Sequence, residues 1–272
     1  MIIQGNQIAK EIELELAEAF KKAPKCLVYF VVFGENKESQ QFMKVKSSVA
    51  ARLGITSHIK TFDSDLSTEQ AIQEINKISK DVNVSGIVIQ LPLPRQLDTV
   101  KVLDSVPTHQ DIDMLSSASI KSYQEGGNNM TPPVAAAIKI ILENHDIDLR
   151  GKDILIVGKG KLVGQPVAQM FDLSNIKYDM VDINTTKESI LSKIKSSDII
   201  ISGVGVPSII QLNMIKENVI LIDAGTSEQN GKMVGDIDIS CVEKSLLFSP
   251  TPGGVGPITV VSLFRNLLNK NI

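Results

Sequence analysis

A glycine-rich stretch in the second half of the chain is the clearest candidate for chemistry. Gly158, Gly160 and Gly164 follow an apolar run that ends at Val157, and a helical pattern comes after them. Glycines at a turn from strand to helix let backbone N–H groups approach the pyrophosphate of a dinucleotide at the helix N-terminus. The GxGxxxG spacing is one residue longer than the usual fingerprint, and similar turns occur for steric reasons alone. The strand before and the helix after nevertheless favour a dinucleotide site.

Two charged residues bear on which dinucleotide would bind. Asp182 ends the next predicted strand, where a carboxylate can accept hydrogen bonds from the adenosine ribose. That carboxylate would repel the additional phosphate of NADP, whereas Lys159 in the turn would attract it. Asp182 could equally be a solvated acid at a strand end. The pattern alone therefore indicates NAD or NADP without deciding between them.

The elements that would position these residues alternate between strand-like and helix-like segments along the chain. The continuous apolar run 26–33 is typical of a strand buried on both faces. The first half predicts further strands at 56–62 and 85–90 and helices at 38–53, 67–78 (with Ser67 as N-cap) and 132–144. The second half predicts strands at 153–157, 178–181, 198–202, 219–224 and 246–248 and helices near 163–172, 188–196 and 258–268. This alternation predicts parallel sheets with right-handed crossovers.

A change of composition around residues 146–152 divides the chain. We predict an α/β domain over 1–145 and a doubly wound, Rossmann-like parallel-sheet domain over 146–257. The last helix, within 258–272, is expected to pack back on the first domain.

The composition excludes several classes of protein. With a net charge of −3 and no basic stripe, the chain does not resemble a nucleic-acid binder. No apolar stretch approaches the roughly 20 residues that a membrane helix needs, and no signal peptide is visible, so we expect a cytoplasmic protein without a membrane partner. The three histidines and two cysteines have no metal-ligand spacing, so no metal is expected.

Three further segments make the chain resemble a known family. They are VIQLPLP at 88–94, QDID at 110–113 and SPTPGGVGPIT at 249–259. Together with 158–166 they resemble the bifunctional methylenetetrahydrofolate dehydrogenase/methenyltetrahydrofolate cyclohydrolase (FolD-like) family, over nearly the whole chain. The resemblance implies a folate-site domain, a Rossmann-like domain, a cleft between them and a homodimer. It also implies that hydride passes from methylenetetrahydrofolate to the nicotinamide, and that water then opens the methenyl ring to give formyltetrahydrofolate.

The resemblance assigns roles in the first half of the chain. Lys46 matches the catalytic lysine, and a partly desolvated ammonium suits the hydrolysis. Gln90 matches a glutamine that contacts the lysine and the folate. Asp113 matches the carboxylate that holds the pterin, from which it can accept two hydrogen bonds. Phe42, one helical turn before Lys46, is expected to stack on the folate.

The resemblance also assigns two loops of the second half. The substrate-binding loop carries few side chains and could lie flat against an aromatic ligand; its residues are Pro252, Gly253, Gly254 and Val255. The cofactor-binding residues are Gly158, Lys159, Gly160, Gly164, Asp182 and Thr226. Taken singly, each candidate could also be an ordinary solvated or structural residue.

The sequence departs from the family at both predicted half-sites. Phe42 replaces a usual tyrosine, so we expect the hydrolytic step to be weakened, and Met114 stands where glycine is common. In the second half, the departures are Lys159 for arginine, Gly160 for serine, Asp182-Ile183-Asn184-Thr185 for a His-Ser-Arg-Thr run, Val206 for lysine and Thr226 for isoleucine. We expect NADP, from the resemblance and Lys159, with NAD as the alternative from Asp182.

Two other functions compete with this interpretation. A diverged paralogue that binds folate or dinucleotide without turnover would explain Phe42, Met114 and the altered cofactor loop. An unrelated Rossmann dehydrogenase acting on a non-folate substrate would explain the second half alone. It would leave segments 88–94 and 249–259 unexplained.

Overall fold

The computed structural model describes residues 1–34, 37–127 and 129–269, and the chain forms two compact units. Unit 1 consists of Met1–Lys10 and Val134–Thr259, and unit 2 of Glu11–Pro133 and Val260–Ile272. The division passes through helices α1 (Gly5–Phe20) and α9 (Val255–Asn269), so each contributes residues to both units. Helix α6 (Pro133–Asn144) falls almost wholly in unit 1, so the units divide before the composition change. The last three residues of the predicted segment 258–272 lie outside the described residues.

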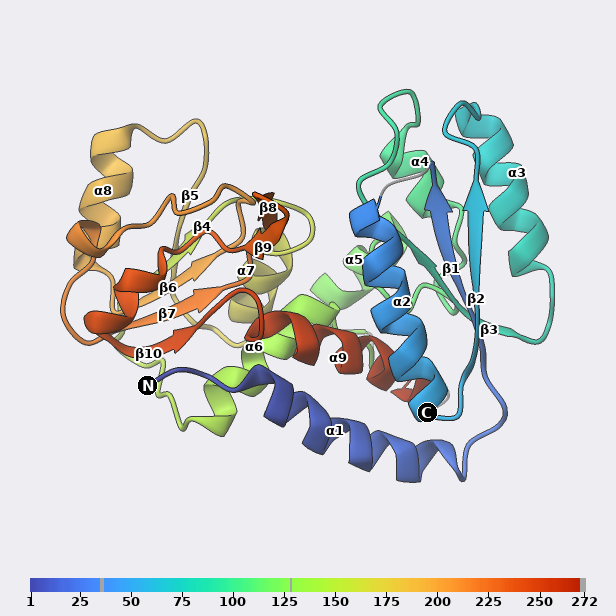
Figure 1. The fold of residues 1–272 in the computed structure, drawn as a ribbon, viewed down its shortest axis with the longest axis horizontal. Coiled ribbons are helices and arrows are strands. Elements are labelled where there is room, and N and C mark those ends of the chain that lie inside the picture. Colours follow the sequence, from blue (N-terminus) through green and yellow to red (C-terminus); the bar gives the residue numbers. More distant parts are fainter. Residues whose placement is uncertain (35–36, 128, 270–272) are drawn as a thin grey trace. The chain divides into compact units, whose positions relative to one another are not determined.

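Unit 1 is built on a five-stranded parallel sheet (Figure 1). Its spatial order is β10-β7-β6-β4-β5, with β4 at Ile154–Val157, β5 at Asp179–Val181, β6 at Ile199–Ser202, β7 at Val219–Asp223 and β10 at Ser245–Ser249. Read from β5 in chain order this is 2-1-3-4-5, a doubly wound arrangement. Helices α7 (Gly164–Leu173) and α8 (Lys187–Ser196) follow β4 and β5. The predicted parallel α/β class is confirmed.

The winding direction of unit 1 changes between β4 and β6, which are neighbours in the sheet. In doubly wound sheets, ligands bind beyond the carboxyl ends of the strands at this point. The loops after β4 and β6 begin at Gly158 and Gly203. The fold therefore places the predicted glycine turn beside the switch point.

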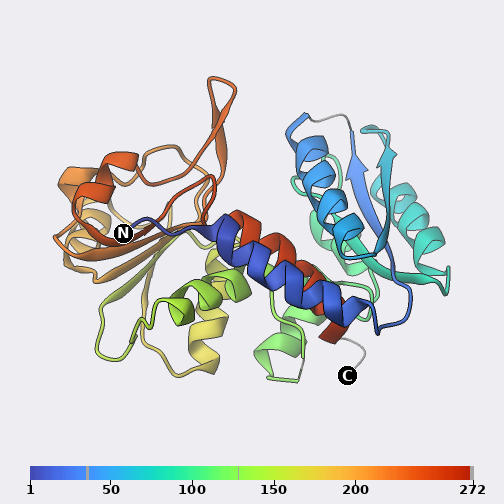
Figure 2. The same ribbon diagram turned by 60° about the horizontal axis from the view of Figure 1, so that its bottom comes forward.

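The edges of unit 1 contain two features that the sequence pattern did not predict. The N-terminal residues pair with β10, since Ile3 donates to the Phe248 carbonyl at 2.8 Å and Phe248 donates to that of Met1 at 2.9 Å. A hairpin joins β8 (Ser227–Gln229) to β9 (Lys232–Val234) and projects from the unit (Figure 2). Asn230 and Gly231 both have positive φ, which an Asn-Gly hairpin turn requires. This dipeptide was the signal that could have revealed the hairpin.

Unit 2 contains a three-stranded parallel sheet in the order β2-β1-β3, with strands at Thr56–Phe62, Leu27–Phe33 and Val84–Ile89. Its helices are α2 (Lys37–Arg52), α3 (Thr68–Ser79), α4 (Thr99–Asp104) and α5 (Ser117–Gln124). Strand β1 is central, and its alternate residues Phe30 and Val31 are both fully buried. Val31 packs in a cluster with residues of α3 and α4, so these helices cover its face. The expectation of a strand buried on both faces is confirmed.

Local sequence explains where α3 begins. Ser67 is its N-cap and forms a capping box with Gln70, as the two side chains each bond the other residue's backbone N–H. The predicted N-cap is confirmed. Helices α4 and α5 were not predicted, since they have only 6 and 8 residues and give little periodicity.

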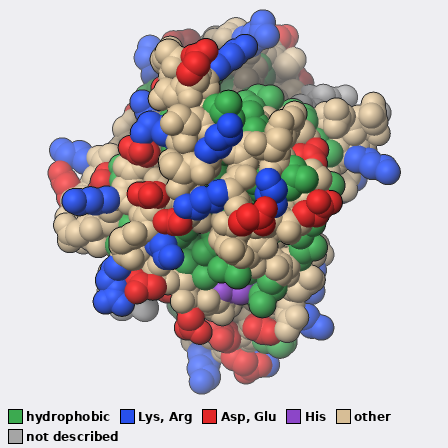
Figure 3. Space-filling view, turned by 90° about the vertical axis from the view of Figure 1, so that its left-hand side faces the viewer, with side chains coloured by type: hydrophobic (Ala, Val, Ile, Leu, Met, Phe, Trp, Pro, Cys, Tyr) green, Lys and Arg blue, Asp and Glu red, His purple; other side chains and the backbone are tan. Residues whose placement is uncertain are grey.

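The surface is mixed in charge on the face drawn in Figure 3, where basic and acidic side chains are interspersed. This agrees with the small net charge of −3. Among the described residues, the helices are too short or too polar for any of them to cross a bilayer.

Candidate active site

Helix α2 carries the predicted lysine of unit 2. Met43 and Ala50 face the core and are fully buried, whereas Lys44 is exposed. Phe42 and Lys46 lie four residues apart and are both half-buried. Residues at this spacing share one helix face, so the aromatic ring and the ammonium can serve the same ligand.

The loop after β3 carries Asp113, and the carboxylate of Asp111 shapes it. Asp111 accepts hydrogen bonds from the backbone N–H groups of Leu115 at 3.2 Å and Ser116 at 2.9 Å. Burial raises the pKa of Asp113, while the Lys46 ammonium acts in the opposite direction and Asp111 raises the pKa further. The charge of Lys46 therefore acts on the carboxyl group of Asp113.

Gln90 lies directly after β3, at the carboxyl edge of the sheet. Its backbone N–H donates to the Val31 carbonyl at 2.9 Å, which extends the pairing with β1. Its side-chain amide donates to the Leu91 carbonyl at 2.6 Å, and the Leu91–Pro92 peptide is cis. Gln90 is thus at the expected edge, with its amide directed to its own loop.

Met114 shows how the loop accommodates a residue other than glycine. Its φ is +59°, in the left-handed region that glycine adopts most easily. Its side chain is 1% exposed and packs against Tyr123 and Met130. The methionine therefore fills a small hydrophobic cluster of unit 2.

Met114→Gly is expected to destabilise the protein by about 2 kcal/mol in urea unfolding. Glycine removes a left-handed strain of roughly 1–2 kcal/mol, but loss of a buried methionine costs about 2–5 kcal/mol. Asn175→Gly is the matched control, because Asn175 has a φ of +55° and an exposed side chain. It should leave stability within about 0.5 kcal/mol or raise it. A Met114→Gly protein more stable than wild type would show that strain dominates.

The glycine turn of unit 1 has the geometry of a phosphate site. Gly158 has a φ of +103°, and its N–H donates to the Val181 carbonyl at 2.8 Å. A Cβ on Gly164 would overlap the carbonyl oxygen of Gly158, so the turn closes only with glycine there. In the described first turn of α7 there is no acidic side chain, and its N-cap, Val163, makes no side-chain capping bond. This helix N-terminus therefore suits an anion such as a pyrophosphate.

Asp182 and Lys159 form an ion pair beside this turn, with Nζ and Oδ2 3.5 Å apart. Asp182 also accepts a hydrogen bond from the N–H of Asn184 at 3.0 Å. That backbone bond, and then the Lys159 charge, lower the pKa of Asp182. Asp182 is thus ionised at neutral pH, and it pairs with Lys159, the lysine predicted to attract a phosphate.

A buried carboxylate that sequence reasoning missed organises the loop after β6. Asp236 is fully buried and accepts from four donors: the Ser202 hydroxyl at 2.7 Å and the N–H groups of Val204 at 2.6 Å, Gly205 at 2.9 Å and Val206 at 2.9 Å. A second buried acid, Asp223, ends β7 and accepts from the N–H groups of Gly225, Asp236 and Ile237. The two carboxylates tie together the loops after β6 and β7, beside the switch point. Only the pairing of glycine and acid in Gly235-Asp236 hinted at this.

The environment of Asp223 makes its charge sensitive to pH. Burial raises the pKa of Asp223 to about 7, against the three backbone donors, which lower it. Its main-chain carbonyl accepts a bond from the Thr251 hydroxyl at 3.1 Å. Asp223 therefore also connects the loop after β7, which includes the exposed Thr226, to the loop after β10.

The loop Pro252–Val255 follows β10 in unit 1. The Thr251–Pro252 peptide is cis, Gly253 has a φ of +98°, and the Gly254 N–H donates to the Pro250 carbonyl at 2.8 Å. A Cβ on Gly254 would overlap the Ser249 hydroxyl and the Pro250 carbonyl. Packing inside the protein therefore requires Gly254, in addition to the flat surface expected from the sequence.

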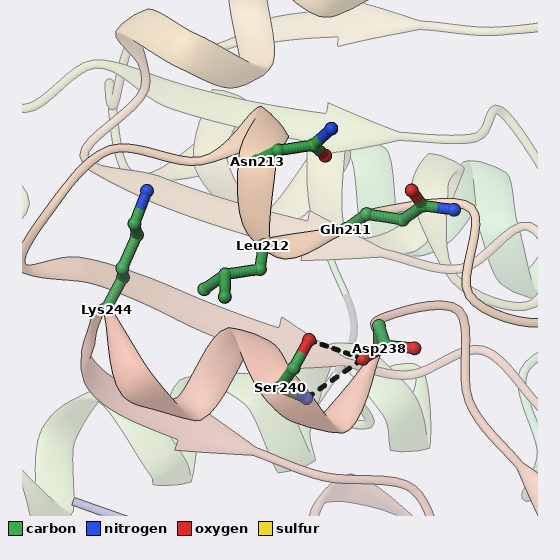
Figure 4. Close-up of a pocket in the computed structure, with 6 residues that line it drawn as sticks. All are labelled: Gln211, Leu212, Asn213, Asp238, Ser240 and Lys244. Carbon is green, nitrogen blue, oxygen red and sulfur yellow. Dashed lines mark hydrogen bonds between the residues drawn. The ribbon is translucent and has the colours of Figure 1, made fainter.

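A pocket of about 570 Å³ opens on another part of unit 1 (Figure 4). Its lining residues are Gln211, Leu212, Asn213, Asp238, Ser240 and Lys244. They come from the segments before β7 and β10, whereas the predicted cofactor residues follow β4, β5 and β7. The pocket contains none of the predicted site residues.

Comparison with known proteins covers both halves of the chain. Residues 3–113 match the tetrahydrofolate dehydrogenase/cyclohydrolase catalytic domain, and residues 132–271 match the tetrahydrofolate dehydrogenase/cyclohydrolase NAD(P)-binding domain. The bifunctional protein FolD of Hydrogenobaculum sp. (strain Y04AAS1) is 34% identical, over 98% of this chain and 97% of the relative. FolD of Staphylococcus aureus (strain Newman) is 32% identical over 98% and 95%.

Solved structures agree with these sequence matches. The bifunctional FolD of Campylobacter jejuni has a TM-score of 0.92 at 28% identity, over 99% of this chain and 98% of that chain. The Trypanosoma brucei methylenetetrahydrofolate dehydrogenase-cyclohydrolase, solved with NADP and an inhibitor, has a TM-score of 0.93 at 26% identity, over 99% and 96%. Sequence and fold therefore agree over the full length, and the chain belongs to the tetrahydrofolate dehydrogenase/cyclohydrolase family.

Proposed function

We propose that this protein oxidises methylenetetrahydrofolate to methenyltetrahydrofolate with a nicotinamide dinucleotide and then hydrolyses the product to formyltetrahydrofolate. The observation that carries this proposal is that the half-buried Lys46 and Asp113 of unit 2 lie within range of each other's charge, in a chain whose relatives are named as bifunctional enzymes. We assign the folate role to unit 2 and the dinucleotide role to unit 1.

The residues of unit 2 divide the work by their chemistry. Asp113, when ionised, accepts two hydrogen bonds from the amino-pyrimidinone edge of the pterin and so fixes the folate. Lys46, held half-buried on α2, places a proton donor beside the reacting carbon, where it assists water in opening the methenyl ring. Gln90 orients the lysine and the folate, and the Phe42 ring stacks on the folate.

The residues of unit 1 hold the dinucleotide and supply a second loop for the substrate. A bound nicotinamide supplies the hydride acceptor, so this chain needs only to position the two reactants. Gly158, Gly160 and Gly164 with the N-terminus of α7 bind the pyrophosphate. Pro252 to Val255 form the substrate loop, and Thr226 lines the cofactor site.

For the cofactor we propose NADP. Lys159 supplies a positive charge beside the ribose position, and the Trypanosoma brucei relative was solved with NADP. Asp182 opposes this choice, because an ionised carboxylate repels the additional phosphate. Steady-state kcat/KM values for NADP and NAD decide the matter, and a strong preference for NAD would mean that Asp182 dominates over Lys159.

The proposed function is tested by supplying the purified protein with methylenetetrahydrofolate and NADP, or separately NAD, while methenyltetrahydrofolate is followed in the same sample. Reduction of the dinucleotide with little accumulation of methenyltetrahydrofolate is the expected result for a bifunctional enzyme. Reduction with methenyl accumulating would mean a dehydrogenase with an impaired hydrolytic step. Folate binding without reduction of either dinucleotide would favour the non-catalytic paralogue. We further propose a homodimer, which light scattering of the same sample tests.

Phe42→Tyr is expected to raise the rate of methenyltetrahydrofolate hydrolysis about 3- to 10-fold, with little change in the dehydrogenase rate. The added hydroxyl can hydrogen-bond in the region of Lys46, and one such bond is worth about 0.5–1.5 kcal/mol. Phe62→Tyr is the control, since Phe62 stacks on Phe33 at a centroid distance of 5.5 Å in β2. An unchanged ratio of the two activities in Phe42→Tyr would mean that the missing hydroxyl does not limit hydrolysis.

A further inference from the structure

Asn266, on the part of α9 that belongs to unit 2, is a buried polar residue outside the sites described above. Its side chain is 3% exposed. Its Nδ2 donates to the carbonyls of Ile112 at 2.9 Å and Thr131 at 2.8 Å, and its Oδ1 accepts from the Thr131 N–H at 3.1 Å. A buried amide with three good hydrogen bonds is a fixed contact, because each bond lost inside a protein leaves a polar group unpaired.

The contact acts on the peptide unit that leads into Asp113. Ile112 is the residue directly before Asp113, and Asn266 fixes its carbonyl. On the other side of Asp113, the Asp111 carboxylate fixes the N–H groups of Leu115 and Ser116. The short segment that carries Asp113 is thus held at both ends.

Most buried side chains around Asn266 on α9 are apolar, which separates its role from general packing. Val261, Leu263, Phe264 and Leu267 are all buried at 1% exposure or less, and the one other buried polar side chain on the described part of this helix is the small Ser262. An apolar residue at position 266 could fill the volume but could not bond Ile112 or Thr131. The hydrogen bonds to Ile112 and Thr131 therefore explain why an amide side chain occupies position 266.

We propose that Asn266 is a positioning residue for folate binding, which acts by fixing the direction from which Asp113 meets the pterin. This inference rests on the proposed role of Asp113. A binding group must be held within about 0.5 Å of its productive geometry by its supporting contacts, and a displacement of about 1 Å can lower activity about 100-fold. Asn266 supplies one such contact to Ile112, which lies 154 positions earlier in the chain.

The experiment compares Asn266→Leu with Ser262→Ala. Leucine keeps the approximate volume and removes all three hydrogen bonds. Ser262 lies one helical turn earlier on α9 and is also buried, but its hydroxyl has no hydrogen-bond partner among the described residues, so removing this hydroxyl should change neither KM. Asn266→Leu is expected to raise KM for methylenetetrahydrofolate at least 10-fold and to leave KM for the dinucleotide within 2-fold, on the scale that misplacement predicts. Ser262→Ala should change neither.

The pH profile gives a second readout that a merely structural role would not move. Asp113 is faced by Lys46 and Asp111, and its buried environment raises its pKa. When the three hydrogen bonds of Asn266 are lost, water reaches the Asp113 carboxylate and lowers its pKa. The acidic limb of kcat/KM for the folate should therefore move to lower pH in Asn266→Leu. If this variant does not fold, Asn266→Ser provides the same comparison with a smaller polar side chain.

The outcomes separate this inference from the proposed function. A wild-type protein without activity would overturn the proposed function. An active wild type whose Asn266 variants keep their folate KM, or lose affinity equally for folate and dinucleotide, would overturn the inference alone.

Discussion

Replacing Lys46 by methionine is expected to slow methenyltetrahydrofolate hydrolysis at least about 100-fold while reducing hydride transfer much less. Proton transfer by a positioned side chain contributes roughly 10²- to 10⁴-fold to a rate, and hydrolysis depends on such a group. Hydride transfer from the methylene carbon produces a delocalised cation and depends mainly on position. The measurement is the two activities of one preparation, with methenyltetrahydrofolate supplied directly for the hydrolytic step.

Lys44→Met is the matched control for this change. Lys44 lies on the same helix, two residues away, but its side chain is exposed. It should leave both activities within about 2-fold, as expected for a surface substitution. Hydrolysis that survives in Lys46→Met would mean that another group activates the water.

The same variant should alter the pH dependence of folate binding. The Lys46 ammonium lowers the pKa of Asp113, so its removal raises that pKa further above the usual value. A protonated Asp113 cannot accept both hydrogen bonds from the pterin. Folate KM in Lys46→Met should therefore begin to rise at a higher pH than in wild type as the solution is acidified.

Replacing Asp236 by asparagine is expected to destabilise the protein by about 3–5 kcal/mol in urea unfolding. The carboxylate accepts four hydrogen bonds, three of them from consecutive backbone N–H groups of residues 204–206. An amide of the same shape presents N–H groups to some of these donors and leaves them unpaired in a buried site, for which losses of this size are usual. Typical domains are stable by only about 5–15 kcal/mol, so this loss is a large fraction.

Asp238→Asn is the control for Asp236→Asn. Asp238 lies two residues along the chain, is half-buried, and accepts hydrogen bonds from the N–H and hydroxyl of Ser240, with the Ser208 hydroxyl as a further donor. Asparagine caps a helix about as well as aspartate, so Asp238→Asn should cost less than about 1 kcal/mol. If the two variants lose equal stability, the four-bond network around Asp236 does not have the weight that its geometry suggests. Folded Asp236→Asn protein should also bind the dinucleotide more weakly, because the loop after β6 adjoins the switch point.

The longer elements could be predicted from the sequence because their periodicity is strong. The buried run of β1 and the strand β2 were placed within one residue at each end, and Ser67 marked the start of α3. Helices α4 and α5 and the hairpin β8–β9 could not be placed in the same way. They are short, and their stability comes from tertiary contacts that leave no periodic pattern.

The candidate site was predicted unequally. Lys46, Gln90 and Asp113 came from the resemblance to a family, since an isolated lysine or aspartate gives no local signal, and their roles stay predictions. The roles of Asp236 and Asn266 were out of reach because their partners lie up to 34 and 154 residues away. A buried polar residue can be recognised only when its partners are known.

The division of α1 and α9 between the two units has a consequence for synthesis on the ribosome. Residues Glu11–Pro133 of unit 2 leave the exit tunnel early, but the α9 segment that begins at Val260 leaves it only after residues 134–259 of unit 1. Until then Ile112 and Thr131 lack the side-chain amide of Asn266, so the segment that carries Asp113 is not yet fixed in the nascent unit 2. Meanwhile Met1–Lys10 waits for the strands of unit 1, because Ile3 pairs with Phe248. An N-terminal domain usually folds before the next one is made, but this order is not available here, because unit 2 completes its folding only after the residues of unit 1 have emerged.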